Sequence, residues 1–199
     1  MNKTPKLDSI TTYLPVMALT MLLMITTSAE IAGQSAGPKV TPLKMPAGSN
    51  SGQIEGDIKA GGTMELRWAE RSSVACFPGT RFEMFNGNHV LYRVTMPARS
   101  RLTIGLVPKN GAAINLYALR QGAAETAAPP NITSAISCEA SYPIYANLPT
   151  GRTVRNADDG SRKIEFISVG SPYSILIGVA GAKGLKEGGY TLGIKIEGR

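Results

Sequence analysis

An alternation of apolar with polar or small residues, at a period of two, is the feature of this sequence that most constrains its fold. In the segment 101–106, for example, Leu102, Ile104 and Leu106 occupy every second position. Successive side chains of a β-strand point to opposite faces, so this pattern predicts a strand with one buried face. Nine segments are predicted as strands: 53–58, 63–69, 81–85, 89–95, 101–106, 113–119, 163–169, 174–179 and 190–196.

Turn-forming residues separate these segments. Asn86-Gly87 and Gly188-Gly189 lie between predicted strands, as do the clusters 108–111 and 158–160. The chain contains 22 glycines and 13 prolines, and no window shows the periodicity of an amphipathic helix. Short strands with turns between them predict an all-β fold, and they favour a jelly-roll-like, two-sheet antiparallel β-sandwich.

The first 29 residues have the layout of a secretory signal peptide. Two lysines precede an apolar run from Leu14 to Ile25, and the small residues Thr27, Ser28 and Ala29 follow it. The run has about 12 residues, whereas a membrane-spanning helix needs roughly 20, which favours a cleaved signal over a retained anchor. We expect cleavage after Ala29 and a mature chain that is secreted or periplasmic, with no membrane span.

Residues 30–51 are rich in Gly, Pro, Ser and Ala, and Pro38, Pro42 and Pro46 recur at regular intervals. Because proline has no backbone N–H group, this segment is predicted to be an extended leader rather than part of the core. We expect a single β-sandwich domain over residues 52–199. A mature chain of about 170 residues is long enough to bury a core of its own.

Cys76 and Cys138 are the two cysteines of the chain. In an exported protein, two cysteines favour a disulfide over two free thiols. This disulfide would close a loop of about 62 residues, for which the chain-entropy estimate is ~4 kcal/mol of stabilisation. His89 is the single histidine, and two distant cysteines with one histidine do not predict a zinc site. We therefore expect no metal or other cofactor.

The formal net charge of the chain is +7, but the basic residues are spread singly. Removal of the predicted signal peptide takes away two lysines and one aspartate, which leaves +6. No long run of basic residues and no nucleic-acid-binding motif accompanies this charge, which argues against a nucleic-acid partner. Scattered charge of this kind is typical of a solvated surface.

The stretch 121–162 differs from the rest because it is long and has few alternating residues. Loops of this length are uncommon in compact domains unless they are functional, and a disulfide through Cys138 would order part of this one. Tyr142 and Tyr145 lie in the stretch, and His89 opens a strand at a position expected to be partly exposed. These three residues form the predicted ligand surface, with a long crossover that binds nothing as the alternative.

Five segments in residues ~89–197 follow one another in a recognisable order. A strand with a Pro-Ala corner precedes a second strand, a Leu-Tyr strand and two closing strands, the last with a Gly-x-Tyr-x-Leu pattern: Leu91–Ala98, Ser100–Ile104, Ile114–Leu119, Tyr173–Val179 and Gly188–Ile194. This order resembles the bacterial pre-peptidase C-terminal domain, which implies a jelly-roll-like β-sandwich that serves as an accessory or binding module. Family members often carry acidic residues where Ala112, Ala113 and Asn115 stand here, so no calcium role and no catalytic residue is implied.

Few residues of the chain are suited to catalysis. A serine–histidine–aspartate triad would have to use His89, and no Gly-x-Ser-x-Gly motif singles out a serine for it. The sequence Asp158-Asp159-Gly160 is typical of a plain turn rather than of a calcium loop. Trp68 lies on an apolar face of a predicted strand, so we expect it in the core rather than on a sugar-binding platform.

The sequence thus predicts a non-catalytic accessory or binding module whose partner is a glycan or a polypeptide at the cell envelope. Two alternatives stay open. One is a small secreted hydrolase that uses His89 with a serine or with Asp158. The other is a structural subunit of an envelope assembly, joined through an exposed sheet edge.

Overall fold

A computed structural model of the chain describes residues 38–143 and 159–199, all of which belong to one compact unit. The predicted signal peptide over residues 1–29, Asp158 and Tyr145 lie outside the described residues. Within the part that is described, no helix is long and apolar enough to cross a membrane.

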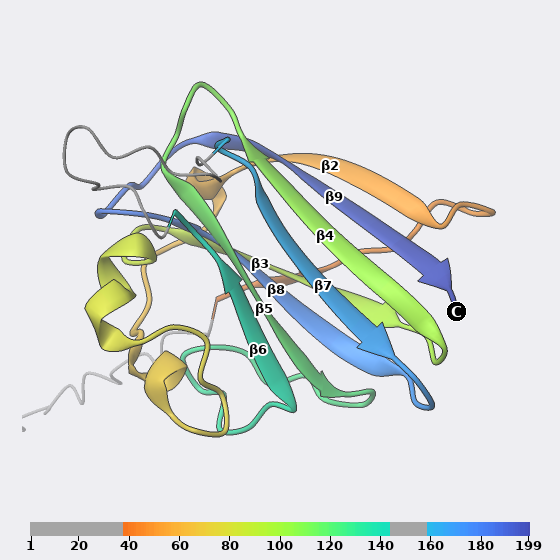
Figure 1. The fold of residues 1–199 in the computed structure, drawn as a ribbon. Coiled ribbons are helices and arrows are strands. Elements are labelled where there is room, and N and C mark those ends of the chain that lie inside the picture. The colour runs from red at the N-terminus through yellow and green to blue at the C-terminus, as the bar shows by residue number, and fades with distance from the viewer. Residues whose placement is uncertain (1–37, 144–158) are drawn as a thin grey trace, which may run out of the picture. The chain divides into compact units, whose positions relative to one another are not determined.

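Two sheets form the framework of the fold (Figure 1). The five-stranded sheet contains, in spatial order, β1 (Val40–Pro42), β3 (His89–Met96), β8 (Tyr173–Gly181), β5 (Ile114–Gly122) and β6 (Ser137–Ser141). The four-stranded sheet contains β2 (Ser51–Asp57), β9 (Gly189–Gly198), β4 (Ser100–Pro108) and β7 (Arg162–Ser168). All strand pairs are antiparallel except β1 with β3. The predicted all-β sandwich is confirmed.

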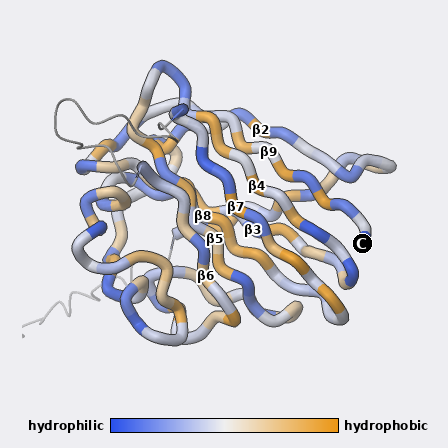
Figure 2. Tube along the Cα trace, in the orientation of Figure 1, coloured by the Kyte–Doolittle hydropathy of each residue, from blue (hydrophilic) through white to orange (hydrophobic). Residues whose placement is uncertain are grey.

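The main core lies between the two sheets and follows from the alternation in the sequence. On β4, Leu102, Ile104 and Leu106 are fully buried, while the residues between them face outward. Figure 2 shows hydrophobic residues recurring along the strands of both sheets. A hydrogen bond of 2.7 Å between the hydroxyl groups of Tyr92 on β3 and Tyr190 on β9 joins the sheets inside this core.

A second apolar cluster covers the outer face of the five-stranded sheet. It packs Trp68, Phe77 and Phe85 against Tyr117 of β5. The aromatic residues of this cluster that precede β3 lie in short 3-10 helices and turns. The 3-10 helices are η1 (Ile58–Ala60), η2 (Arg67–Glu70) and η3 (Gly79–Met84).

The strands predicted over 63–69 and 81–85 are therefore wrong. Their apolar side chains pack on the outer face of the five-stranded sheet, whose inner strands β3, β8 and β5 already have a paired strand on each side. The two segments therefore cover the sheet without pairing with one of its strands. In so short a segment, alternation alone does not separate a strand from an irregular segment with one buried face. Trp68 is nonetheless buried in the core, as expected.

The disulfide between Cys76 and Cys138 is present, with its Cα atoms 4.8 Å apart. Cys138 lies in β6, a strand inside the stretch predicted as a long loop. The disulfide ties this edge of the five-stranded sheet to the segment between η2 and η3. Part of the 121–162 stretch is thus ordered, as its cysteine predicted.

Part of the segment predicted as an extended leader contributes to the sandwich. Residues Val40–Pro42 form β1, which pairs in parallel with β3, and β2 already begins at Ser51. Between these strands, Leu43 and Met45 pack against the main core.

Candidate functional site

A groove runs along the side of the sandwich where each sheet ends in an edge strand. The edge strand of the five-stranded sheet is β1, and that of the four-stranded sheet is β2. Both strands, the segment 60–62 and the start of β3 line the groove, whose volume is about 690 Å³. Two strand edges therefore face one open space.

The floor of the groove is apolar and closed. Leu43, Ile54 and Val90 line it and pack against the main core. Tyr92 also lines the groove but is only 7% exposed, because its hydroxyl group is bonded to Tyr190 beneath the floor. Burial raises the pKa of Tyr190, and the hydrogen bond with Tyr92 adds to this effect, so the Tyr190 hydroxyl group stays neutral.

Proline blocks the outer edge of β1. The N–H group of Leu43 donates to the carbonyl of Arg93 on β3, at 2.7 Å. Successive residues of a strand point their backbone groups to opposite sides. Pro42 therefore faces away from β3, where its missing N–H group costs no ladder bond and offers no donor to a further strand.

The register of β2 with β9 decides which residues of β2 point their backbone groups to the outer edge. The N–H group of Ile196 donates to the carbonyl of Asn50 at 2.7 Å, and the N–H group of Ile58 donates to the carbonyl of Gly188 at 3.1 Å. Antiparallel strands bond through every second residue, so the even-numbered residues of β2 face β9. The backbone groups of the odd-numbered residues point outward: Ser51, Gln53, Glu55 and Asp57.

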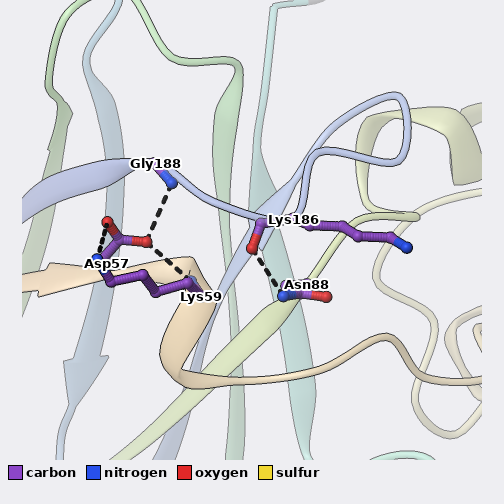
Figure 3. A network of polar contacts seen from close by, with 5 residues as sticks. All are labelled: Asp57, Lys59, Asn88, Lys186 and Gly188. Atoms are coloured by element: carbon purple, nitrogen blue, oxygen red, sulfur yellow. Dashed lines mark hydrogen bonds and ion pairs between the residues drawn. The ribbon is translucent and has the colours of Figure 1, made fainter.

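Local contacts limit this outward row at both ends. The Ser49 hydroxyl group donates to the carbonyl of Ser51 at 2.8 Å and accepts from its N–H group at 3.2 Å. At the other end, the Asp57 carboxylate accepts from the N–H groups of Lys59 at 2.8 Å and Gly188 at 3.0 Å (Figure 3). These bonds hold the pKa of Asp57 below its usual range and turn the chain into η1.

Between Ser51 and the turn at Asp57 lie Gln53 and Glu55. Within residues 38–143 and 159–199, the outward N–H and C=O groups of these two residues have no hydrogen-bond partner. Unpaired N–H and C=O groups on an edge strand form a template to which another strand can pair. The central part of β2 is thus an open strand edge beside an apolar groove.

The rim of the groove is positively charged. Lys39 and Lys44 line it, both are exposed, and neither has an ion-pair partner in the described part of the chain. The one carboxylate that lines the groove, Glu55, is paired with Lys109 and accepts from the Thr191 hydroxyl group at 2.8 Å. The contact with Lys109 is the main reason that the pKa of Glu55 is lowered.

His89 borders the groove, but its side chain is buried. It is 1% exposed, so the expectation of a partly exposed position was wrong. Its Nε2 donates to the carbonyl of Phe85 at 2.6 Å, and its Nδ1 accepts from the hydroxyl group of Tyr117 at 3.1 Å. Burial lowers the pKa of His89 to about 4, so the ring is neutral at physiological pH.

The contacts of His89 bear on the hydrolase alternative. Both ring nitrogens are engaged by a backbone carbonyl and a phenol, so neither faces a serine hydroxyl or a carboxylate. Asp159 accepts from the N–H and hydroxyl groups of Ser161 at 2.8 and 2.7 Å, as in the predicted turn. Across the described segments, no three His, Cys, Asp or Glu side chains are grouped to hold a metal ion.

Tyr142, a second predicted ligand residue, does not line the groove. Tyr142 is half-buried and packs edge-on against Phe85, with ring centroids 5.5 Å apart, in the cluster that covers the five-stranded sheet. Tyr142 and His89 both contact Phe85, so they meet in this buried cluster and do not form an exposed surface together. A ligand role for Tyr142 and Tyr145 stays a prediction.

A second cavity, of about 390 Å³, lies at one end of the sandwich and has a mostly aliphatic lining. Its two buried polar residues bond to the protein itself. Arg162 donates from Nε to Oδ1 of Asn115 at 2.9 Å, and Nδ2 of Asn115 donates to the carbonyl of Met84 at 2.7 Å. These bonds link β7, β5 and η3, which gives the polar groups of this cavity a structural role.

The groove was missed because no single motif marks it. One signal was available: Pro38, Pro42 and Pro46 are spaced by four residues, an even number that places all three on the same edge of an extended chain. Such a pattern is typical of an edge strand and could have located β1. The open edge of β2 has no counterpart in its local sequence.

No family model matches the chain, and no curated protein sequence matches it. Solved structures with a similar fold include PliG, a periplasmic inhibitor of g-type lysozyme from Aeromonas hydrophila, at 15% identity and a TM-score of 0.42 over 79% of this chain and 96% of that one. They also include CorA, a surface-associated copper-binding protein of Methylomicrobium album BG8, at 9% identity and a TM-score of 0.44 over 81% and 98% of the two chains.

The pre-peptidase C-terminal domain of collagenase from Bacillus anthracis is similar at 9% identity and a TM-score of 0.36, over 80% of this chain and 95% of that domain. None of these likenesses transfers a ligand or a site residue to this chain. The chain is a β-sandwich similar to pre-peptidase C-terminal domains, as its sequence implied.

Proposed function

We propose that this protein is a non-catalytic binding module that works outside the cytoplasm and holds a polypeptide partner in the groove between β1 and β2. The observation that carries the proposal is the open edge of β2 beside an apolar floor. Among the described residues, the outward backbone groups of Gln53 and Glu55 have no partner, and Ile54, Glu55 and Val90 line the groove. Backbone hydrogen bonds with pockets for alternate side chains are a recurring way to bind peptides.

The lining of the groove favours a polypeptide over a glycan. Sugar rings pack their apolar faces on exposed aromatic side chains, which combine an apolar body with a polar tip. Tyr92 and His89 are the aromatic residues that line the groove, and they are 7% and 1% exposed. A peptide backbone, by contrast, matches the donors and acceptors of the β2 edge.

Two further observations support work outside the cytoplasm without catalysis. The disulfide between Cys76 and Cys138 is of the kind that persists in oxidising compartments, and a signal peptide is predicted before it. The single histidine is buried in a neutral state with both nitrogens bonded inside the protein, which leaves no general base of that type at the surface.

Peptide and glycan arrays probed with the oxidised full-length protein test this function. We expect binding to peptides, and we expect Ala60→Trp to weaken it at least about tenfold, because Ala60 is exposed and lines the groove. Ala123→Trp, at an exposed position on the β5–β6 connection, serves as the matched control and should bind like the unchanged protein. The absence of binding on the peptide array, or equal binding by both variants, would overturn the proposal.

A further inference from the structure

We propose that the partner binds as an extended, acidic strand that adds to the outer edge of β2 and pairs with the backbones of Gln53 and Glu55. This inference rests on the proposed function and specifies its mode and the chemistry of the partner. The added strand would become the fifth strand of the four-stranded sheet.

The spacing of the free backbone groups fits a strand. Gln53 and Glu55 each point one N–H and one C=O group outward, and they lie two residues apart on a regular strand. That separation, roughly 7 Å, is the repeat at which one strand offers paired bonds to the next. An added strand can therefore use four backbone hydrogen bonds without any change in β2.

The register of the added strand is limited on both sides. Met45 and Pro46 lie against Gly52, where an added Cβ would be 3.5 Å from the Pro46 Cδ atom. Beyond that point, Ser49 already bonds the outward groups of Ser51. At the other end, Asp57 turns the chain away from the strand direction. The free window is thus short and centred on Gln53 and Glu55.

The other edges of the sandwich differ from that of β2 in their contacts and surroundings. The outer edge of β1 carries Pro42, which has no N–H group. On the opposite side, the outer edge of β7 is partly engaged: the N–H group of Lys163 donates to the Ser141 hydroxyl group at 3.2 Å, and Arg120 donates to the carbonyl of Ile167 at 3.3 Å. Natural proteins commonly close edges in such ways. The edge of β2 is distinguished by its place beside the apolar groove and the two rim lysines.

Charge defines the partner's chemistry. Lys39 and Lys44 lie on the rim across the groove from β2, exposed and without ion-pair partners in the described residues. Every second side chain of an added strand points to the same face, so acidic residues at alternate positions can meet these lysines. Glu55 does not offset them, because it is already paired with Lys109.

A second copy of this chain fits the edge less well. Each copy carries a positive net charge, +6 after removal of the predicted signal peptide, so two copies repel each other. Pairing of two β2 strands would also bring the lysines of the two grooves toward one another. The occupant inferred here is therefore an acidic segment of another polypeptide.

Proline variants test the backbone contacts. Gln53→Pro and Glu55→Pro each remove one outward N–H group and leave the bonds to β9 in place, because the odd-numbered residues do not bond to β9. Gln53→Ala and Glu55→Gln keep the N–H group and serve as matched controls. The probes are two matched peptides about as long as the seven-residue β2, one with Glu and one with Lys at alternate positions.

We expect the Glu peptide to bind more tightly than the Lys peptide. Each proline variant should lose about tenfold in affinity with its melting temperature retained, and the controls should lose little. Lys44→Glu should reverse the preference between the peptides. Should a proline variant fail to fold, hydrogen exchange of the unchanged protein gives the answer, since the amides of Gln53 and Glu55 should become protected when the Glu peptide is added.

The outcomes separate this inference from the proposed function. Peptide binding that Ala60→Trp abolishes, but that neither proline variant weakens, would leave a peptide groove and overturn strand addition. Tighter binding of the Lys peptide would overturn the acidic partner. A dimer in light scattering that Gln53→Pro converts to a monomer would assign the edge to a second copy and overturn the inference. Loss of all peptide binding, with the Gln53 and Glu55 amides unprotected, would overturn both proposals.

Discussion

The ring of Tyr117 on β5 lies over Gly178, its partner on β8. The two residues are paired across the strands, and a Cβ atom added to Gly178 would overlap the ring. Tyr117 is fully buried at the centre of the cluster that covers the five-stranded sheet, in contact with Trp68 and Phe85. The absence of a side chain at Gly178 thus creates the space for the central aromatic residue of this layer.

Gly178→Ala is expected to destabilise the protein. The new methyl group would force the Tyr117 ring out of a packed layer, which costs about 1–3 kcal/mol of unfolding free energy. Gly105→Ala on β4 is the control, because an added Cβ there meets no atom within 4 Å and alanine suits a strand better by about 0.5–1 kcal/mol. Urea unfolding measures both values. A loss at Gly178 no greater than at Gly105 would contradict this account.

His89 predicts a dependence of stability on pH. Its pKa is lowered from 6.5 to about 4 by burial, so the unfolded chain binds a proton more readily than the folded one. The resulting stabilisation is complete above pH 6.5 and is lost as the pH falls toward 4, by up to about 3 kcal/mol. Unfolding free energies measured between pH 7 and pH 4 report this loss.

His89→Asn is the comparison for that experiment. The variant lacks the titrating ring, while the carboxylates that titrate at low pH are the same in both proteins. Its stability should therefore fall less steeply over this range than that of the unchanged protein. Parallel curves would show that His89 is not the group responsible.

Arg93 on β3 should be needed to order the connection after β5. Its guanidinium donates to five oxygens at 2.7–3.0 Å, which belong to Gln121, Ser174, Glu125, Thr126 and Ala127. Lysine has fewer donors and lacks the planar fork, so Arg93→Lys should lose about 2 kcal/mol of unfolding free energy. Limited proteolysis should also cut residues 122–128 faster in this variant.

The matched control for that change is Arg101→Lys. Arg101 is exposed on β4, and we expect the same substitution there to alter stability by no more than about 0.5 kcal/mol. Equal effects at the two positions would mean that the bonds of Arg93 do not hold the connection in place.

Seven of the nine predicted strands are present, and the reason is local. In segments such as β4 and β9, each apolar residue faces the core and its neighbours face outward, so the period of two is visible without knowledge of the partner strand. The disulfide was equally accessible, because two cysteines in an exported chain leave few alternatives.

The candidate site could not be derived in this way. Whether Gln53 and Glu55 are free depends on which strand lies beside β2, and that pairing joins residues more than a hundred positions apart. The burial of His89 depends likewise on Phe85 and Tyr117 from other elements.

The sequence by itself determined that strands form, where seven of them lie and which cysteines join, because side-chain alternation and residue type act within a few positions. Only the tertiary structure decided that Trp68 and Phe85 reach the core from 3-10 helices and turns rather than from strands. It also decided that β1 ends one sheet with a proline and that β2 ends the other with backbone groups that have no partner in residues 38–143 and 159–199. An edge is a property of the neighbours that a strand lacks, and apart from the proline of β1 the residues of these two strands do not encode it.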